Sequence, residues 1–271
     1  FKDLLITAEH CLFFDGKFVP ARMLVNGRSI FYDTTITSYD YYHIETEDHS
    51  VIMADGMLTE SYLDTGNRRS FTQKGNVVSI GGRRALSWDQ AAVPLTVSRE
   101  AVEPIFRQIE IRAEEQGCPV QTAPQPLTYD SDLSLITNTG AALHQIREHN
   151  GRVMFMIPAG VKSVRIVSNA SRPCDVVGPF VDDRRTLGVL VGDVKLYEGN
   201  ATTTLTAYLH QADLSGWNNV EDGTMRWTDG SAHLDLGRRP LGSIALMALQ
   251  IHAGGPYLLA DTASGKNALQ A

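Results

Sequence analysis

A β-hairpin is predicted by the stretch Cys11-Leu12-Phe13-Phe14-Asp15-Gly16-Lys17-Phe18, in which two apolar runs flank an Asp-Gly pair. Both turn residues tolerate positive φ, which a tight two-residue turn requires. The same pattern returns at residues 51–58 around Asp55-Gly56. Further strands are expected at residues 4–7, 18–24 and 41–47, with Asn26-Gly27 as another turn signal. The N-terminal region is therefore predicted to be a succession of hairpins.

One α-helix is predicted over about residues 98–117. Ser98 offers an N-cap, and Gly117 stops the run. Between them, apolar residues recur at helical spacing: Val102, Ile105, Phe106, Ile109 and Ile111. Pro104 falls inside this run, so we expect either a kinked first turn or a helix that starts nearer Glu103.

The C-terminal half is predicted to be a β-sandwich of roughly eight strands. The strand-like runs are residues 133–137, 153–157, 163–167, 187–197, 203–209, 224–228, 232–236 and 243–251. The whole chain is therefore expected to be mainly β, in four parts. These are a hairpin domain at 1–70, a connector with the helix at 71–126, the β-sandwich at 127–260 and a flexible tail at 261–271.

Composition excludes several classes of function. The chain has 271 residues and a formal net charge of −7, which argues against the nucleic-acid backbone as a partner. Since no apolar run approaches the length of a membrane-spanning helix, membrane insertion is not expected. The three cysteines, Cys11, Cys118 and Cys174, are too far apart for a zinc knuckle or a disulfide framework. We therefore predict no metal and no cofactor.

The strongest chemical signal is the pair Thr7 and His10. A hydroxyl and an imidazole three residues apart can surround one peptide bond, the imidazole donating to the amide nitrogen while the hydroxyl helps to hold the peptide twisted. A peptide held in this way is primed for acyl transfer. The alternative is a strand residue followed by a turn histidine, because Thr-x-x-His also arises by chance.

The first seventy or so residues resemble the Hedgehog/intein, or Hint, autoprocessing domains, in particular a bacterial subgroup with a region C-terminal to the Hint module. The resemblance rests on four segments of this chain: Leu4-Leu5-Ile6-Thr7-Ala8-Glu9-His10, residues 19–27, residues 41–58 and residues 60–68. It implies that the chain holds the C-terminal part of a Hint domain, and that the N-terminal half of that domain is its partner.

The resemblance implies self-directed chemistry. In the family, an N-terminal Cys or Ser attacks its own preceding carbonyl, which turns the peptide into a thioester or ester. By that resemblance Thr7 and His10 are the assisting pair. His43 is the next catalytic candidate, for proton transfer or for orienting the leaving group, with a structural histidine as the alternative.

Two departures from the family pattern limit the expected reaction. We expect the nucleophile to lie in the other half of the domain, because Cys11 falls inside a predicted strand. Inteins end in His-Asn, whereas the matching place here is Glu60-Ser61. The sequence therefore predicts N-terminal cleavage or ligation in a complete precursor, without splicing, and an inactive fragment when this part stands alone.

A second candidate site lies in the C-terminal half. Trp217, Glu221, Arg226 and Trp227 bring aromatic rings, a carboxylate and a guanidinium into one short segment. Such groups stack on sugars and bind their hydroxyls, so the competing hypothesis is a secreted or cell-surface module that recognises carbohydrate, with the Hint part as an inactive relic. Alternatively, both tryptophans fill the core of the sandwich, and the module is an interaction domain without a ligand.

Overall fold

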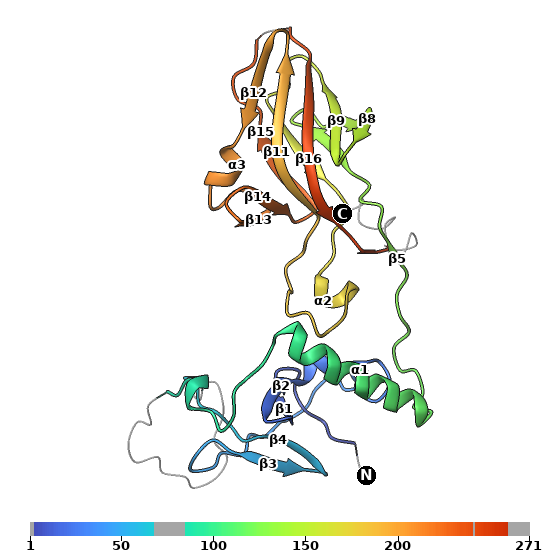
Figure 1. Cartoon of the computed structure of the whole chain (residues 1–271), viewed down its shortest axis with the longest axis vertical. Helices are drawn as coiled ribbons and strands as arrows, with labels where there is room; N and C mark the ends of the chain where they lie inside the picture. Colours follow the sequence, from blue (N-terminus) through green and yellow to red (C-terminus); the bar gives the residue numbers. More distant parts are fainter. Residues whose placement is uncertain (1–2, 68–84, 241, 260–271) are drawn as a thin grey trace. The chain divides into compact units, whose positions relative to one another are not determined.

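The computed structural model describes residues 3–67, 85–240 and 242–259. The chain divides into two compact units, shown with the sequence colouring in Figure 1. The N-terminal unit contains residues 1–123 and Pro179–Asp182, and the C-terminal unit contains residues 124–178 and 183–271. Strands predominate over helices in the described residues, which confirms the mainly-β prediction.

The division of the chain into four domains stays a prediction. The predicted tail at 261–271 and part of the predicted connector, residues 71–84, lie outside the described residues. Among the helices in the described part of the chain, none is both long and apolar enough to cross a bilayer.

The N-terminal unit is built on two hairpins. Its sheet has the order β2-β1-β4-β3. The strands are β1 (Cys11–Phe14), β2 (Lys17–Pro20), β3 (Val51–Ala54) and β4 (Met57–Glu60). Asp15-Gly16 and Asp55-Gly56 form the two tight turns, each with both residues at positive φ, so both predicted hairpins are confirmed. The central pairing of the sheet is antiparallel and joins Leu12 of β1 to Thr59 of β4.

Two of the predicted strands are absent. Residues 4–7 and 41–47 have no strand structure, and apolar side chains within them, such as Leu5 and Ile44, are exposed. The alternation of residue types was real, but no described strand lies alongside to complete the ladder. Likewise, Asn26-Gly27 joins no pair of strands, because the Asn26 side chain accepts hydrogen bonds from three amides of the loop at 28–30. The predicted run 18–24 ends as a strand at Pro20 and continues as the short helix η1 (Ala21–Leu24).

The predicted helix is present as α1 (Arg99–Glu115), with Ser98 as its N-cap residue and Pro104 inside it. Val102 and Phe106 pack on the core of the N-terminal unit together with Leu12 and Val19. Ile111, predicted to share that face, is exposed because it lies two residues from Ile109, on the other side of the helix. The short helix η3 (Trp88–Gln90) precedes α1.

The C-terminal unit contains two main sheets (Figure 1). The smaller has the order β15-β10-β6-β7: β15 (Ser231–Asp235), β10 (Ser163–Val167), β6 (Ser134–Thr137) and β7 (Ala142–His144). The larger has the order β13-β14-β11-β16-β9-β8, with β12 also paired to β11: β13 (Trp217–Glu221), β14 (Met225–Thr228), β11 (Val189–Glu198), β16 (Ala245–Gly254), β9 (Arg152–Ile157), β8 (Arg147–His149) and β12 (Ala201–Leu205). A small pair joins β5 (Leu127–Thr128) to β17 (Tyr257–Leu258).

One hydrophobic core joins the two main sheets. It takes alternate residues from each, such as Val164 and Ile166 of the smaller sheet and Phe155 and Met247 of the larger. This is the packing of a β-sandwich. Two short helices, α2 (Pro173–Val176) and α3 (Ala207–His210), were not predicted. The predicted strand 203–209 therefore ends at Leu205, and α3 follows it.

Candidate active site

His10 lies in the turn that leads into β1. Its amide donates to the carbonyl of Thr7 at 3.1 Å, and its carbonyl accepts from the amide of Ala21 at 2.9 Å. The backbone on both sides of the imidazole is therefore fixed. The side chain is 19% exposed, so the ring is largely shielded from water.

The hydroxyl of Thr59 on β4 orients the His10 ring. This hydroxyl lies 2.8 Å from the carbonyl oxygen of Cys11 and also contacts Nε2 of His10. Because a carbonyl only accepts, the single hydroxyl proton of Thr59 goes to Cys11, and the hydroxyl oxygen accepts from His10. This assigns the neutral imidazole as the tautomer that carries its proton on Nε2 and leaves Nδ1 with a lone pair.

The carboxyl group of Glu60 stands between two imidazoles. Its Oε1 is 3.8 Å from Nδ1 of His10, and its Oε2 is 3.9 Å from Nε2 of His49. Oε1 also accepts the amide of Cys11 at 2.8 Å. Burial raises the pKa of Glu60 to about 7, although the hydrogen bonds from Cys11 act in the opposite direction. A neutral carboxyl is therefore substantially populated at neutral pH.

His49 is a buried, neutral partner of this cluster. Its Nδ1 accepts the amide of Ala92 at 3.1 Å, so Nε2 carries the proton and donates to the carbonyl of Ser61 at 3.0 Å. The side chain is 1% exposed, and burial lowers the pKa of His49. The ring also packs on Phe18 and Trp88. His49 is therefore locked in place, whereas His10 keeps some access to solvent.

Cys11 is poorly suited to be a nucleophile. It begins β1 and is 1% exposed. Burial, followed by the influence of Glu60, raises the pKa of its thiol well above the usual range. Since the thiolate is the attacking form, the reactive species is suppressed.

The structure brings His43 near His10 but does not bring the Thr7 hydroxyl to it. The charge of His43 contributes to lowering the pKa of His10, after burial, so the two imidazoles are within electrostatic range. The His43 ring packs between those of Tyr41 and Tyr62, with ring centres 5.4 and 4.9 Å away. Within the described residues, Thr7 is tied to His10 through its backbone carbonyl alone.

Residues 1–66 match the family model described as the Hint domain. They form a Hint domain segment. The match ends before α1 and leaves the β-sandwich outside it. No curated protein and no solved structure matches the chain. We refer to residues 1–66 as the Hint segment.

Three groups in the Hint segment were not identified from the sequence as part of the site: His49, Thr59 and Glu60. A sequence signal existed for one pairing, because the two-residue turn at Asp55-Gly56 fixes the register and sets Glu60 opposite Val51, two residues from His49. The position of Thr59 depends instead on the pairing of β4 with β1, which joins residues 47 positions apart in the sequence and which no local pattern predicts. Among the described residues, no three His, Cys, Asp or Glu side chains converge as a metal site requires.

The second candidate site is dispersed by the fold of the C-terminal unit. Trp217 belongs to the sandwich core and is 9% exposed. Its indole N–H donates to the carbonyl of His233 at 2.7 Å, and its ring stacks on Tyr208 with centres 4.7 Å apart. The face on which a sugar would stack is therefore already covered by protein, in agreement with the alternative that Trp217 fills the core.

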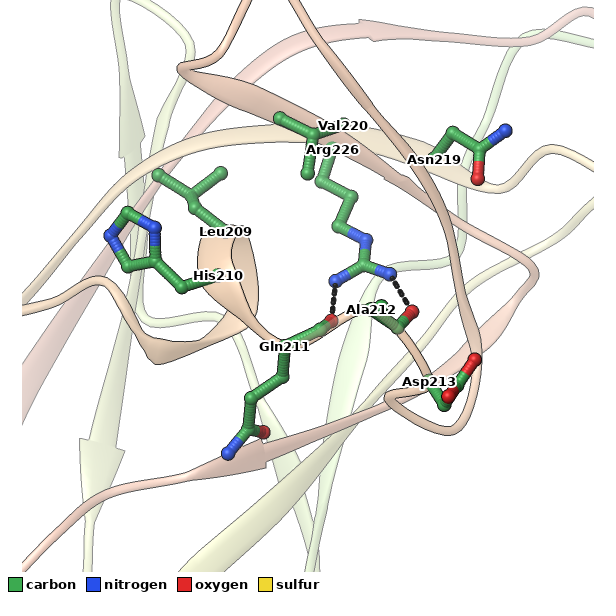
Figure 2. A pocket seen from close by; sticks show the side chains of 8 residues that line it. All are labelled: Leu209, His210, Gln211, Ala212, Asp213, Asn219, Val220 and Arg226. Carbon is green, nitrogen blue, oxygen red and sulfur yellow. Dashed lines mark hydrogen bonds between the residues drawn. The ribbon is translucent and has the colours of Figure 1, made fainter.

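The other three residues of that site also have structural partners or separate positions. Glu221 accepts from Arg185 at 2.9 Å. Arg226 is 2% exposed and donates to four backbone carbonyls, those of Tyr208, Gln211, Ala212 and Asn218. Figure 2 shows two of these bonds at the pocket beside α3. Trp227, which follows Arg226 on β14, is only partly buried and points to the other face of the strand. These four residues therefore do not form one binding surface.

Replacing Trp217 by phenylalanine is expected to destabilise the C-terminal unit by about 1–2 kcal/mol. The smaller ring keeps most of the apolar contact with Tyr208 but leaves the His233 carbonyl without its indole donor. Urea unfolding measured by circular dichroism checks this. Trp227→Phe, a matched change at a partly exposed ring, is expected to cost less, and equal costs would contradict the core role assigned to Trp217.

Proposed function

We propose that the Hint segment takes part in self-processing of its own precursor, by an N-to-S or N-to-O acyl shift in which His10 protonates the leaving amide nitrogen. The observation that carries this proposal is the orientation of His10. Its Nε2–H donates to the buried hydroxyl of Thr59, and its side chain remains 19% exposed. An imidazole with a fixed tautomer and partial exposure is suited to deliver a proton to a peptide nitrogen.

The proposed step forms one bond and breaks one. The sulfur or oxygen of an attacking Cys or Ser bonds to the carbonyl carbon of the preceding peptide, and the bond between that carbon and the amide nitrogen breaks. The nitrogen gains a proton from Nε2 of His10, and the proton that the attacking group loses passes to His10 in its place, so the proton count is unchanged. We propose that the attacking residue comes from the N-terminal half of the Hint domain, because the buried Cys11 thiol is unsuited to the task.

His43 has a secondary place in this proposal. It lies within electrostatic range of His10 and disfavours the charged imidazole there. A neutral His10 can give its Nε2 proton to the nitrogen and then take up the proton of the attacking group. This role of His43 is part of the proposed function, and the cleavage assay described next tests it.

The test is thiol-induced cleavage of a precursor that joins the complementary N-terminal half to this chain. Dithiothreitol is expected to cleave a thioester intermediate, and hydroxylamine an ester. In both cases the attacking residue stays on the product that contains this chain. Mass spectrometry of both products identifies the junction. A precursor that stays intact under both reagents, although folded, would contradict the proposed function.

The orienting hydroxyl is expected to be Thr59 rather than Thr7. Thr59→Val removes the acceptor for His10 and the donor to Cys11, so cleavage of the precursor is expected to slow by ~10-fold or more. Thr7→Val is the matched control and is expected to cleave at nearly the original rate, because Thr7 holds His10 through its carbonyl. Densitometry of the cleavage time course measures both rates. A slow Thr7→Val precursor beside an unaffected Thr59→Val precursor would restore Thr7 to the role predicted from the sequence.

A further inference from the structure

The carboxyl group of Glu60 has the geometry of a proton carrier for His10. It is 13% exposed, and its two oxygens lie 3.8 and 3.9 Å from ring nitrogens of His10 and His49. The amide of Cys11 holds Oε1 at 2.8 Å, so the group is fixed while it faces both imidazoles. Arg22, the nearby cation that influences Cys11, pairs with Glu9 and Asp182 instead.

We propose that Glu60 exchanges a proton with Nδ1 of His10 and thereby sets the protonation state of the imidazole that serves the acyl shift. This inference rests on the proposed function of the Hint segment. It makes Glu60 a positioning residue that acts through His10 and does not touch the reacting peptide. The position is the one where the sequence shows Glu60-Ser61 in place of the His-Asn pair that ends an intein.

The two ring nitrogens of His10 differ in a way that suits a relay. Nε2 carries a proton, which it donates to Thr59, and Nδ1 has a lone pair that faces Glu60. When the carboxyl of Glu60 is neutral, its proton can pass to Nδ1 as Nε2 gives its own proton to the leaving nitrogen. At 3.8 Å, Oε1 and Nδ1 are about 1 Å beyond hydrogen-bond distance, so the transfer requires the two side chains to approach. The proton lost by the attacking group then passes to Nε2 of His10 while Nδ1 returns its proton to Glu60, so no proton is gained or lost overall.

The usual order of proton affinities is reversed in this pair. Burial raises the pKa of Glu60 to about 7, whereas burial and the charge of His43 lower the pKa of His10 below 6.5. The proton therefore rests on the carboxyl rather than on the imidazole.

On the side away from His10, Glu60 faces His49, which carries no charge. Its ring is held neutral, with Nδ1 accepting from Ala92 and Nε2 donating to the Ser61 carbonyl. Among the residues that the structure describes, the titratable groups that face Glu60 are His10 and Cys11, from the turn before β1 and from β1, and His49 from the loop before β3. Because the Cys11 thiol stays protonated, His10 is the group with which Glu60 can trade a proton.

The test is a histidine titration by NMR on the full chain, with ¹⁵N-labelled histidine and ring signals assigned through single His-to-Gln variants. In the unaltered chain, the His10 ring signals are expected to show two inflections, its own and one near pH 7 from Glu60. In Glu60→Gln the inflection near pH 7 is expected to vanish, while the amide oxygen still accepts from Cys11. Glu9→Gln, which neutralises an exposed carboxylate one residue from His10, is the control and is expected to keep both inflections.

A His10 titration that is the same in the unaltered chain and in Glu60→Gln would overturn the inference. If Glu60→Gln fails to fold, the carboxyl signal of Glu60 in the unaltered chain, labelled with ¹³C-glutamate, gives the answer: a midpoint below pH 5 overturns the proposal. The readout is separate from processing. If the titrations of His10 and Glu60 are coupled but the precursor never cleaves, the proposed function alone is contradicted. If the two titrations are independent and the precursor cleaves, the Glu60 relay alone is contradicted.

Discussion

The His10→Ala precursor is expected to cleave ~10²–10⁴-fold more slowly than the unaltered precursor when treated with thiol. This is the usual contribution of a positioned acid or base to a proton transfer. The imidazole is the group in this cluster that combines an assigned proton on Nε2 with partial exposure to solvent. Without it, the leaving nitrogen must take its proton from water. The rate is measured from the appearance of the cleaved product over time.

The control for His10→Ala is a histidine outside the Hint segment. His149 lies exposed on β8 of the C-terminal unit, so His149→Ala removes an imidazole without disturbing the cluster. Cleavage of that precursor is expected to proceed at the original rate. Circular dichroism establishes that both variants fold. A folded His10→Ala precursor that cleaves as fast as the His149→Ala precursor would remove His10 from the mechanism.

The Arg226→Met variant is expected to lose about 3–4 kcal/mol of stability in the C-terminal unit. The guanidinium donates to four backbone carbonyls, and methionine has a similar length but no donor. Two of the freed carbonyls, at Gln211 and Ala212, line the pocket in Figure 2 and can bind water. The carbonyl of Tyr208 is bonded to Arg226 in a buried setting and loses its partner. The change is therefore expected to loosen the segment between α3 and β13.

Urea unfolding followed by hydrogen–deuterium exchange of β11 and β16 peptides measures the stability of the C-terminal unit separately from that of the N-terminal unit. Arg165→Met is the matched control, because Arg165 is exposed on β10 and makes one long hydrogen bond, at 3.4 Å, to Ser231. Its expected cost is below about 0.5 kcal/mol. An equal loss of stability in the two variants would show that the hydrogen bonds of Arg226 to the four carbonyls do not stabilise the C-terminal unit.

Local sequence patterns predicted the elements whose geometry is set within a few residues. The Asp-Gly pairs fixed both N-terminal hairpins because their backbone angles suit a two-residue turn, and Val102 and Phe106 marked the buried face of α1. The same reasoning failed at residues 41–47, where alternation of residue types was present without a neighbouring strand. At Trp217 it left two alternatives open, a sugar-binding surface and the core, and the ring is stacked in the core.

By itself, the sequence determined the mainly-β character of the chain, its two N-terminal hairpins and the Hint segment with His10 in it. Those features depend on turn chemistry, residue periodicity and a local motif. Only the tertiary structure decided which hydroxyl and which carboxyl meet that histidine. The antiparallel pairing of β1 with β4 places Thr59 and Glu60 beside His10 and Cys11. The register of strands far apart in the sequence depends on the core that they share, so no local pattern specifies it.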